Sequence, residues 1–368
     1  MDMHAGKRSF IIKAASTVAT AMLGGGVSRN VLAAGEPMKV AFVYLGPVGE
    51  SGWTYQHDMS RRELEANLGS KIVVRTVPNV NEGPDSERVI RELSADGNKL
   101  IFCVSFGYMQ PAMRVAAENP DKFYTTASGY LTAPNVGGYN AKWQEGGYLA
   151  GIIAAKTTKA NVLGFVGALP VPDVVWDLNA FTLGARSVNP KIQVRTVFVN
   201  SWYDPARERE AAISLINAGA DVLTHFTDTP SVVTAAEERG LPSISFHSDM
   251  SKFAPKHYLT GITHHWGDYY TQVTREVMAG TWKGSLYFGG LKEGVIRMAP
   301  FGPGVSKDVA DLINARSREI AEGKLKVFAG PIKDQKGVMR VTAGASYPDA
   351  DLGKMDWFVD GVIGGPAK

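Results

Sequence analysis

The sequence has only one cysteine among its 368 residues, which excludes several kinds of site. A single thiol makes no internal disulfide, and Cys103 lies inside the apolar run KLIFCVS, where a small buried hydrophobe is expected. No cysteine stands near the end of the N-terminal segment, so lipid attachment through sulfur is not expected there. The cysteine content thus argues against a disulfide scaffold and against a lipoprotein.

The chain also lacks an excess of charge of one sign. Its 39 Lys and Arg against 36 Asp and Glu give a formal net charge of +3. Residues 1–33 alone contribute +3, because they carry four basic residues and one acidic residue, and the remainder is therefore formally neutral. A neutral chain predicts no basic surface for nucleic acid. We expect no nucleic-acid partner.

Motifs of several enzyme classes are missing. The chain has no GxSxG, no HExxH and no glycine-rich phosphate loop. The spacing of His225, His247, His264 and His265 matches no metal-binding pattern. We therefore expect no metal, no cofactor and no catalysis. The best pair that the loops offer a hydrolase is Asp249 with His247.

The N-terminus has the three parts of an export signal. A basic start is followed by an apolar middle and by small residues at Ala33 and Ala34. KRSFIIK resembles a twin-arginine signal, with Lys7 where the first arginine belongs. Polar residues interrupt the apolar run short of the roughly 20 residues that a membrane span needs. The pattern predicts that residues 1–34 are a signal, cleaved near Ala33 or Ala34, and that the product is periplasmic.

The rest of the chain alternates apolar strands with amphipathic helices. Strands are expected at MKVAFVYL, KIVVRTV and KLIFCVS, with helices near 55–68, 84–96 and 109–118, and two short strands follow at KFYTTASG and NVGGYNA. Strands that are apolar on both faces and separated by helices are typical of a parallel sheet covered on both sides. This series predicts a first α/β lobe.

A second series of the same kind then begins. Strands are expected at NVLGFVGAL, IQVRTVFV, DVLTHFT and PSISFHS, with helices at VVWDLNAFTLGARSV and near 205–218 and 231–239. LTGITHHWGDYY is expected to return the chain to the first lobe through a helix near 268–278. LYFGGLKEGVIRMAPFG is expected to form a hairpin, and Ser306 to cap a last amphipathic helix. Together the two series predict two doubly wound lobes, residues 38–157 plus 264–325 and residues 158–263 plus 326–368.

Aromatic residues follow several of the predicted strands. Ligands of open parallel sheets bind beyond the carboxyl ends of the strands, where Trp53, Phe106, Tyr108 and Trp266 are expected. An aromatic face there suits a flat ligand, because stacking contributes ~1–3 kcal/mol per base. The alternative is that some of these rings seal the core or the hinge, as most aromatic residues do.

Polar residues at the same ends complete the candidate binding site. Asp228 and Asp249 follow two strands of the second lobe, where a carboxylate accepts hydrogen bonds from N–H groups. Both aspartates also suit helix capping. Asn140 offers an amide that is donor and acceptor at once, or serves a turn. Trp176 and Asn179, from the first helix of the second lobe, are the remaining candidates.

Four segments carry a resemblance to a known family. They are KVAFVYLGPVGESGW, GGYNAKWQEGGYLAGIIAA, NSWYDPAREREAAISLINAGADVL and MDWFVDGVIG. Together they resemble the basic membrane protein family of ABC-transporter substrate-binding proteins. The resemblance implies a type I periplasmic-binding fold, with two Rossmann-like lobes joined by three crossovers. It also implies a monomer that captures purine nucleosides and passes them to a membrane permease with ATPase subunits.

The sequence departs from the family where nucleosides bind. Nucleoside-binding members resemble DKSFNQ in the first loop, where this chain has Gly52 and Trp53. Asp249 matches the family's ribose-binding aspartate, but the family's lysine is replaced near GITHHW by histidines and Trp266. A ribose hydroxyl left unpaired costs ~1–3 kcal/mol. The resemblance and this loss together predict a free purine base, most closely adenine.

Three alternatives stay open from the sequence. The chain is instead a purine nucleoside-binding protein if other residues hold the sugar. It is a ligand-sensing receptor partner if the same fold signals rather than transports. A periplasmic nucleosidase is the third alternative, and it needs an acid or a carboxylate pair at the bond to be broken.

Overall fold

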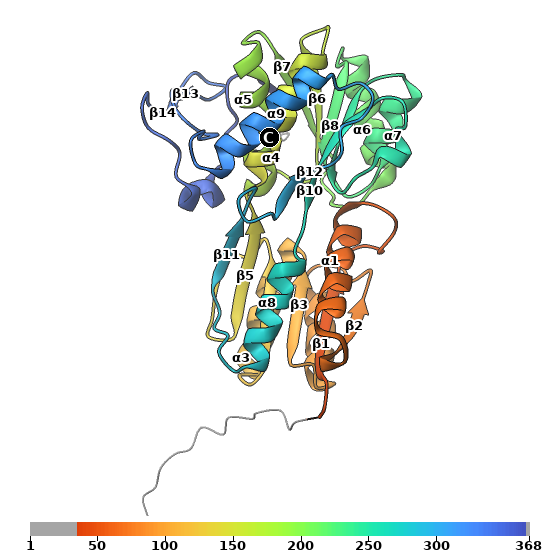
Figure 1. The fold of residues 1–368 in the computed structure, drawn as a ribbon, viewed down its shortest axis with the longest axis vertical. Helices are drawn as coiled ribbons and strands as arrows, with labels where there is room; N and C mark the ends of the chain where they lie inside the picture. The colour runs from red at the N-terminus through yellow and green to blue at the C-terminus, as the bar shows by residue number, and fades with distance from the viewer. Residues whose placement is uncertain (1–34, 366–368) are drawn as a thin grey trace, which may run out of the picture. The chain divides into compact units, whose positions relative to one another are not determined.

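The computed structural model describes residues 35–365, which contain two large, mainly parallel β-sheets with helices on their faces (Figure 1). The predicted export signal, residues 1–34, lies outside the described residues. No helix within the described range is long and apolar enough to cross a membrane. The alternation of strands and helices therefore produces the α/β class that the sequence predicts.

The first sheet is entirely parallel, with strand order β11-β5-β4-β3-β1-β2. Its strands are β1 (Met38–Tyr44), β2 (Ile72–Val77), β3 (Leu100–Val104), β4 (Phe123–Ala127), β5 (Val136–Ala141) and β11 (Leu286–Gly289). Its helices are α1 (Gly52–Leu68), α2 (Pro84–Ala95), α3 (Met109–Glu118) and α8 (Gly267–Met278).

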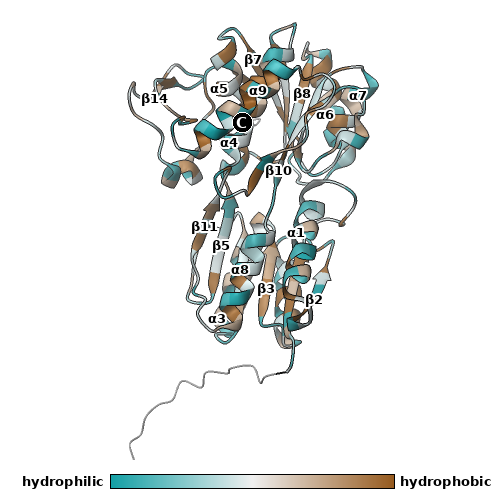
Figure 2. Ribbon diagram, viewed as in Figure 1, coloured by the Kyte–Doolittle hydropathy of each residue, from teal (hydrophilic) through white to brown (hydrophobic). Residues whose placement is uncertain are grey.

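Alternation along β1 explains how both faces of this sheet are covered. Phe42 and Tyr44 pack in the cluster that includes α1 and α8, whereas Ala41 and Val43 pack in the cluster with α2 and α3. All five residues of β3 are buried, and Figure 2 shows the strand as more hydrophobic than the helices α1 and α8. The unbroken apolar runs are thus the interior of a three-layer lobe.

The second sheet has the order β12-β10-β9-β8-β6-β7-β15, and only β12 is antiparallel to its neighbour. Its strands are β6 (Val162–Gly167), β7 (Gln193–Phe198), β8 (Val222–Phe226), β9 (Ser243–His247), β10 (Tyr258–His264), β12 (Ile296–Met298) and β15 (Val362–Gly364). Its helices are α4 (Trp143–Thr157), α5 (Pro172–Val188), α6 (Pro205–Asn217), α7 (Ser231–Glu238) and α9 (Lys307–Ala321). A small sheet pairs β13 (Ile332–Lys333) with β14 (Met339–Val341).

The chain passes between the two sheets three times. It crosses from β5 into α4, returns from β10 into α8, and crosses again from β11 to β12. The expected hairpin at LYFGGLKEGVIRMAPFG is wrong, because β11 pairs with β5 of the first sheet and β12 pairs with β10 of the second. The segment is instead the third crossover, which gives the predicted number of connections between the lobes.

Two helices lie on a different lobe from the one expected. The predicted boundaries place α4 and α9 with the first lobe, but α4 packs against α5 and α9 beside the second sheet. Glycines explain this close packing: a Cβ at Gly151 would lie 2.0 Å from the backbone oxygen of Phe181, and one at Gly184 would lie 2.0 Å from that of Tyr148. Gly147 and Gly151 of EGGYLAG, which both face α5, thus serve a helix–helix contact inside the second lobe.

Candidate ligand-binding site

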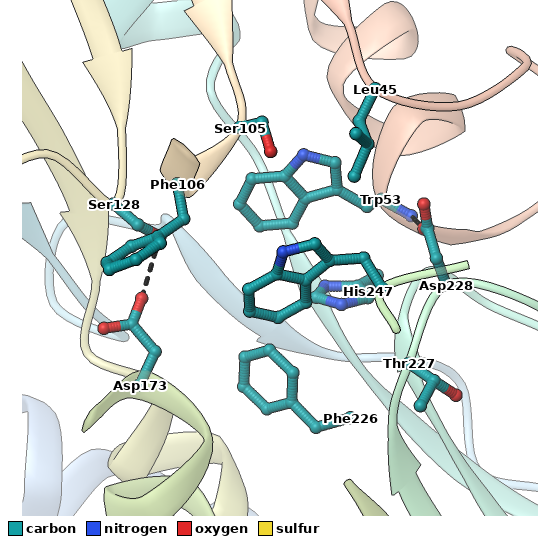
Figure 3. Close-up of a pocket in the computed structure, with 11 residues that line it drawn as sticks. Leu45, Trp53, Ser105, Phe106, Ser128, Asp173, Phe226, Thr227, Asp228 and His247 are labelled. Carbon is teal, nitrogen blue, oxygen red and sulfur yellow. Dashed lines mark hydrogen bonds between the residues drawn. The ribbon is translucent and has the colours of Figure 1, made fainter. Parts of the chain in front are cut away.

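A cavity lies where the carboxyl ends of the two sheets face each other (Figure 3). Its volume is about 30 Å³, which is room for about two water molecules. The first lobe supplies Leu45, Trp53, Ser105, Phe106 and Ser128, and the second supplies Asp173, Trp202, Phe226, Thr227, Asp228 and His247.

Trp53 forms part of the first-lobe wall and is half-buried there. It is the second residue of α1, and its indole Nε1 donates a hydrogen bond to the backbone oxygen of Val104 at 3.0 Å. His57 packs edge-on against the indole, with ring centroids 4.3 Å apart. Anchored at its N–H and supported by His57, the indole has a fixed orientation beside the cavity.

Gly52 allows the two lobes to approach each other at the start of α1. Its φ of 90° lies in the region that favours glycine, and a Cβ there would lie 2.1 Å from the backbone oxygen of Asp228. Its N–H donates a hydrogen bond to the hydroxyl of Ser248 at 2.8 Å. The glycine before the tryptophan is therefore a contact point between lobes.

The second lobe caps the N-terminus of α1. Ser51 occupies the N-cap position but its side chain makes no capping hydrogen bond. Instead, the Trp53 N–H donates to the Asp228 carboxylate and the Gly52 N–H to Ser248. Lys252 and Glu50 add an ion pair across the same gap at 2.6 Å. Because the free N–H groups of a helix need acceptors, these contacts favour the closed arrangement of the lobes.

Asp173 is the second carboxylate on the cavity wall. Its Oδ2 accepts hydrogen bonds from the Ser128 hydroxyl at 2.8 Å and from the Asn140 amide at 3.0 Å, and both donors come from the first lobe. Burial raises the pKa of Asp173 to about 6. The oxygen of the same amide accepts from the Trp143 indole N–H at 3.1 Å. Asn140 therefore holds Asp173 and does not itself line the cavity.

Three of the predicted site residues do line the cavity, namely Trp53, Phe106 and Asp228. The carboxylate of Asp228 is buried, and burial raises its pKa well above the ordinary value, while the hydrogen bond from the Trp53 backbone N–H opposes the rise. The position of Asp228 beyond β8 follows from the strand-end rule. The group that donates a hydrogen bond to its carboxylate, however, is the backbone N–H of Trp53 at the start of α1.

Tyr108 and Trp266 are strand-end aromatics that do not line the cavity. Tyr108 is fully buried in the core between the first sheet, α2 and α3, and its hydroxyl donates to the backbone oxygen of Val80. Trp266 is also buried, and its indole N–H donates to Nδ1 of His264 at 2.8 Å. Both rings belong to the packing, which corrects their predicted placement.

Asp249, Trp176 and Asn179 also lie away from the cavity lining. Asp249 is exposed and accepts a hydrogen bond from the Ser251 N–H at 2.8 Å, a local contact two residues along the chain. Trp176 is buried in α5, with its ring 6.2 Å from that of Phe288. The Asn179 amide is buried and donates to the Trp357 backbone oxygen at 2.8 Å, so it fastens the C-terminal segment.

Sequence reasoning missed eight cavity residues, of which Trp202 and His247 are the most informative. Trp202 follows β7 in the segment NSWYDPA, and His247 is the last residue of β9. The strand-end rule that selected Trp53 applies equally to both. The full set of missed residues is Leu45, Ser105, Ser128, Asp173, Trp202, Phe226, Thr227 and His247.

Buried histidine rings stand behind and beside Trp53. The ring centroids of His247 and His264 each lie 5.1 Å from that of Trp53. Burial lowers the pKa of His57, His247 and His264 well below the ordinary value, so these rings are neutral near pH 7. In the part of the chain that the structure describes, no group of three His, Cys, Asp or Glu side chains has an arrangement that holds a metal ion.

Comparisons with known proteins agree with this architecture. The chain is 44% identical to a purine-binding protein of Brucella abortus over 94% of its own length and 97% of that protein. It is 34% identical to a putative ABC transporter glucose-binding protein of Haloferax volcanii, over 83% of this chain and 77% of that one. Among solved structures, a solute-binding protein from Conexibacter woesei superposes with a TM-score of 0.66 at 23% identity, covering 78% of this chain and 98% of the other.

A solute-binding protein from Aeropyrum pernix superposes with a TM-score of 0.67 at 18% identity, over 81% of this chain and 93% of the other. These two structures establish the two-lobed fold. Residues 38–327 match the family model described as ABC transporter substrate-binding protein, PnrA-like. The predicted family is thus confirmed: the chain belongs to the PnrA-like family of ABC transporter substrate-binding proteins.

Proposed function

We propose that this substrate-binding protein captures a free purine base, adenine, between its lobes and delivers it to a membrane permease. The observation that carries the proposal is the aromatic wall formed by Trp53 and Phe106 at the lobe interface. A flat base stacks on such rings with ~1–3 kcal/mol each. The relative of 44% identity is named for purine binding, which supports the same ligand class.

The positions of the expected ribose partners favour a base over a nucleoside. Asp249 matches the ribose-binding aspartate of the family, yet it is exposed and does not line the cavity. Where the family lysine is expected, Trp266 is buried with its ring centroid 4.8 Å from that of Tyr139. A nucleoside would thus lack the two ribose partners of the family, at ~1–3 kcal/mol for each hydroxyl left unpaired.

A sugar is the second candidate, because one relative is named as a putative glucose-binding protein. Sugars need many hydrogen-bonding partners. The hydroxyls of Ser105 and Ser128 already donate to carboxylates of the protein, at 2.6 Å and 2.8 Å. The cavity therefore offers a sugar few free hydroxyl donors, whereas its aromatic rings suit a flat ligand.

Calorimetric titration of the purified protein with adenine, guanine, hypoxanthine, adenosine and glucose tests the proposal. We expect adenine to bind most tightly and adenosine at least tenfold more weakly. Tighter binding of adenosine than of every free base would overturn the choice of a base. Tightest binding of glucose would overturn the purine class as a whole.

We also propose that the protein works in the periplasm as a monomer, after removal of the signal near Ala33 or Ala34. The family membership and the N-terminal sequence pattern support this placement. The intact mass of protein recovered from the periplasm tests the cleavage position and the absence of lipid. Loss of adenine uptake on deletion of the gene distinguishes transport from sensing.

A further inference from the structure

His247 has an unusual backbone conformation at the cavity. It is the last residue of β9, only 3% exposed, and it lines the cavity between Trp53 and Phe226 (Figure 3). Its φ is 70°, in the left-handed region that few residues other than glycine adopt. Such a conformation is strained, and residues that adopt it are concentrated at functional sites. The strained backbone of His247 thus suggests a functional role for this residue.

The neighbours of His247 hold its ring in one orientation. It lies edge-on to Trp53 at 5.1 Å and 79°, and edge-on to Phe226 at 5.2 Å and 87°, measured between ring centroids and planes. Trp143 packs at 5.8 Å and 88°. Three aromatic side chains therefore hold the imidazole in place, and none of them forms a hydrogen bond with it.

The imidazole also has an unused hydrogen-bonding atom. Its Nδ1 is buried and has no hydrogen-bond partner among residues 35–365. Neighbouring polar groups of the cavity are already engaged: Ser105 donates to Glu82, Ser128 to Asp173, and Thr227 to Glu208. A buried polar atom left without a partner destabilises the protein. A ligand that reaches the imidazole removes this cost.

Trp202 presents the same feature on the same wall. Its indole Nε1 is buried without a partner in the described range, and the residue lines the cavity. An indole N–H is a donor only, whereas a neutral imidazole carries one donor and one acceptor. Burial lowers the pKa of His247, and the neighbouring His264 and His225 lower it further. The ring of His247 is therefore neutral. The free groups thus match a ligand that has ring nitrogens and an N–H.

We propose that His247 is the specificity-determining residue of the site, and that its imidazole hydrogen-bonds to the edge of the bound base while Trp202 Nε1–H donates to a ring nitrogen. The inference rests on the proposed capture of a purine base. It assigns base recognition to His247 rather than to Asp249 or Asp228. The first of these aspartates is exposed, and the carboxylate of the second accepts a hydrogen bond from the Trp53 N–H.

The test compares adenine binding by the wild type, His247→Phe and a matched control, His257→Phe. The Phe variant keeps an aromatic ring and removes both nitrogens. The control makes the same change at a histidine that pairs with Glu237, away from the cavity lining. We expect His247→Phe to bind adenine 10- to 100-fold more weakly, and the control to match the wild type. Binding by His247→Phe within twofold of the wild type would overturn the inference.

A second measurement does not depend on the folding of the variant. Wild-type protein is titrated with adenine and with 1-deaza-, 3-deaza- and 7-deazaadenine, each of which lacks one ring nitrogen. We expect at least one analogue to bind fivefold or more weakly than adenine. Equal affinity for all four compounds would contradict recognition of the base edge.

The same titrations separate the inference from the proposed function. If the wild type binds neither adenine nor another purine, the proposed function and the inference both fail. If the wild type binds adenine and the deaza compounds equally well, only the role of His247 fails. A folded His247→Phe that loses the discrimination seen in the wild type confirms the coupling of residue and ligand atom.

Discussion

The backbone N–H of Trp53, in the first lobe, donates a hydrogen bond to the carboxylate of Asp228, in the second lobe. This single contact joins the proposed stacking ring to the closure of the cleft. Since Ser51 gives α1 no side-chain cap, the start of the helix is capped only when the lobes meet. Closure of the lobes and formation of the hydrogen bond that holds the Trp53 backbone therefore occur together.

We predict that Asp228→Ala weakens adenine binding by about 5- to 30-fold, the equivalent of the ~1–2 kcal/mol that a capping group contributes. The variant loses an acceptor that exists only in the closed form. Calorimetry measures the affinity, and small-angle scattering reports closure. The matched control is Asp249→Asn, which changes an exposed aspartate of the same lobe. An unchanged affinity in Asp228→Ala would show that the contact does not stabilise closure.

Gly52→Ala should block closure more severely. The new Cβ would meet the backbone oxygen of Asp228 at 2.1 Å, and a backbone atom cannot rotate away as a side chain does. Gly49→Ala is the control: its φ of 54° is also positive, but the nearest atom to its Cβ lies 3.9 Å away. We expect adenine affinity to fall at least tenfold more in Gly52→Ala than in Gly49→Ala. Comparable losses of affinity in the two variants would show that backbone strain, and not the contact with Asp228, is responsible.

A buried carboxylate in the second lobe predicts that the stability difference between the wild type and the Asp177→Asn variant depends on pH. Asp177 is 1% exposed, its Oδ1 has no partner within residues 35–365, and burial raises its pKa well above the ordinary 3.8. A raised pKa in the folded state means that stability is fully present below about pH 3.8 and is lost as the pH rises through the folded pKa.

Asp177→Asn should therefore raise the melting temperature at pH 8 by several degrees and change it little at pH 4. Thermal unfolding followed by circular dichroism measures both values. Asp356→Asn serves as the control, because that aspartate is exposed and its replacement removes no buried charge. A stabilisation of equal size at pH 4 and pH 8 would contradict the assignment to a buried charge.

The contact between α4 and α5 gives a prediction about the fold alone. Gly151→Ala should lower the free energy of unfolding by about 1–3 kcal/mol, the usual cost of overpacking. Its Cβ would lie 2.0 Å from the Phe181 backbone oxygen. Gly353→Ala, where no atom lies within 4 Å of the new Cβ, should have little effect. Denaturant unfolding compares the two variants, and equal stability of both would refute the packing argument.

The sequence predicted the strands and helices well, because they depend on local pattern. Met109–Glu118 forms the expected helix α3, and the Ser306 hydroxyl caps α9 by accepting from the Val309 N–H. The segment that makes the third crossover was predicted as a hairpin, because β11 and β12 are short and adjacent, which is also typical of a hairpin. Only their pairing with strands far away in the chain distinguishes the two arrangements.

The candidate site was harder to predict, because a strand end fixes where a residue lies but not where its side chain points. Trp53 and Tyr108 both follow strands of the first sheet, yet only Trp53 lines the cavity, while Tyr108 packs behind the sheet. Asn140 reaches the site indirectly, through Asp173. The strain and the unpaired nitrogen of His247 depend on tertiary packing and have no sequence signature.

The most direct test of the central claim is the affinity of Trp53→Ala for adenine, measured by calorimetry beside the wild type. Trp53 supplies a stacking face on the cavity wall, so we predict tight binding by the wild type and a loss of at least tenfold in the variant. Equal affinities of the two proteins for adenine would contradict the account.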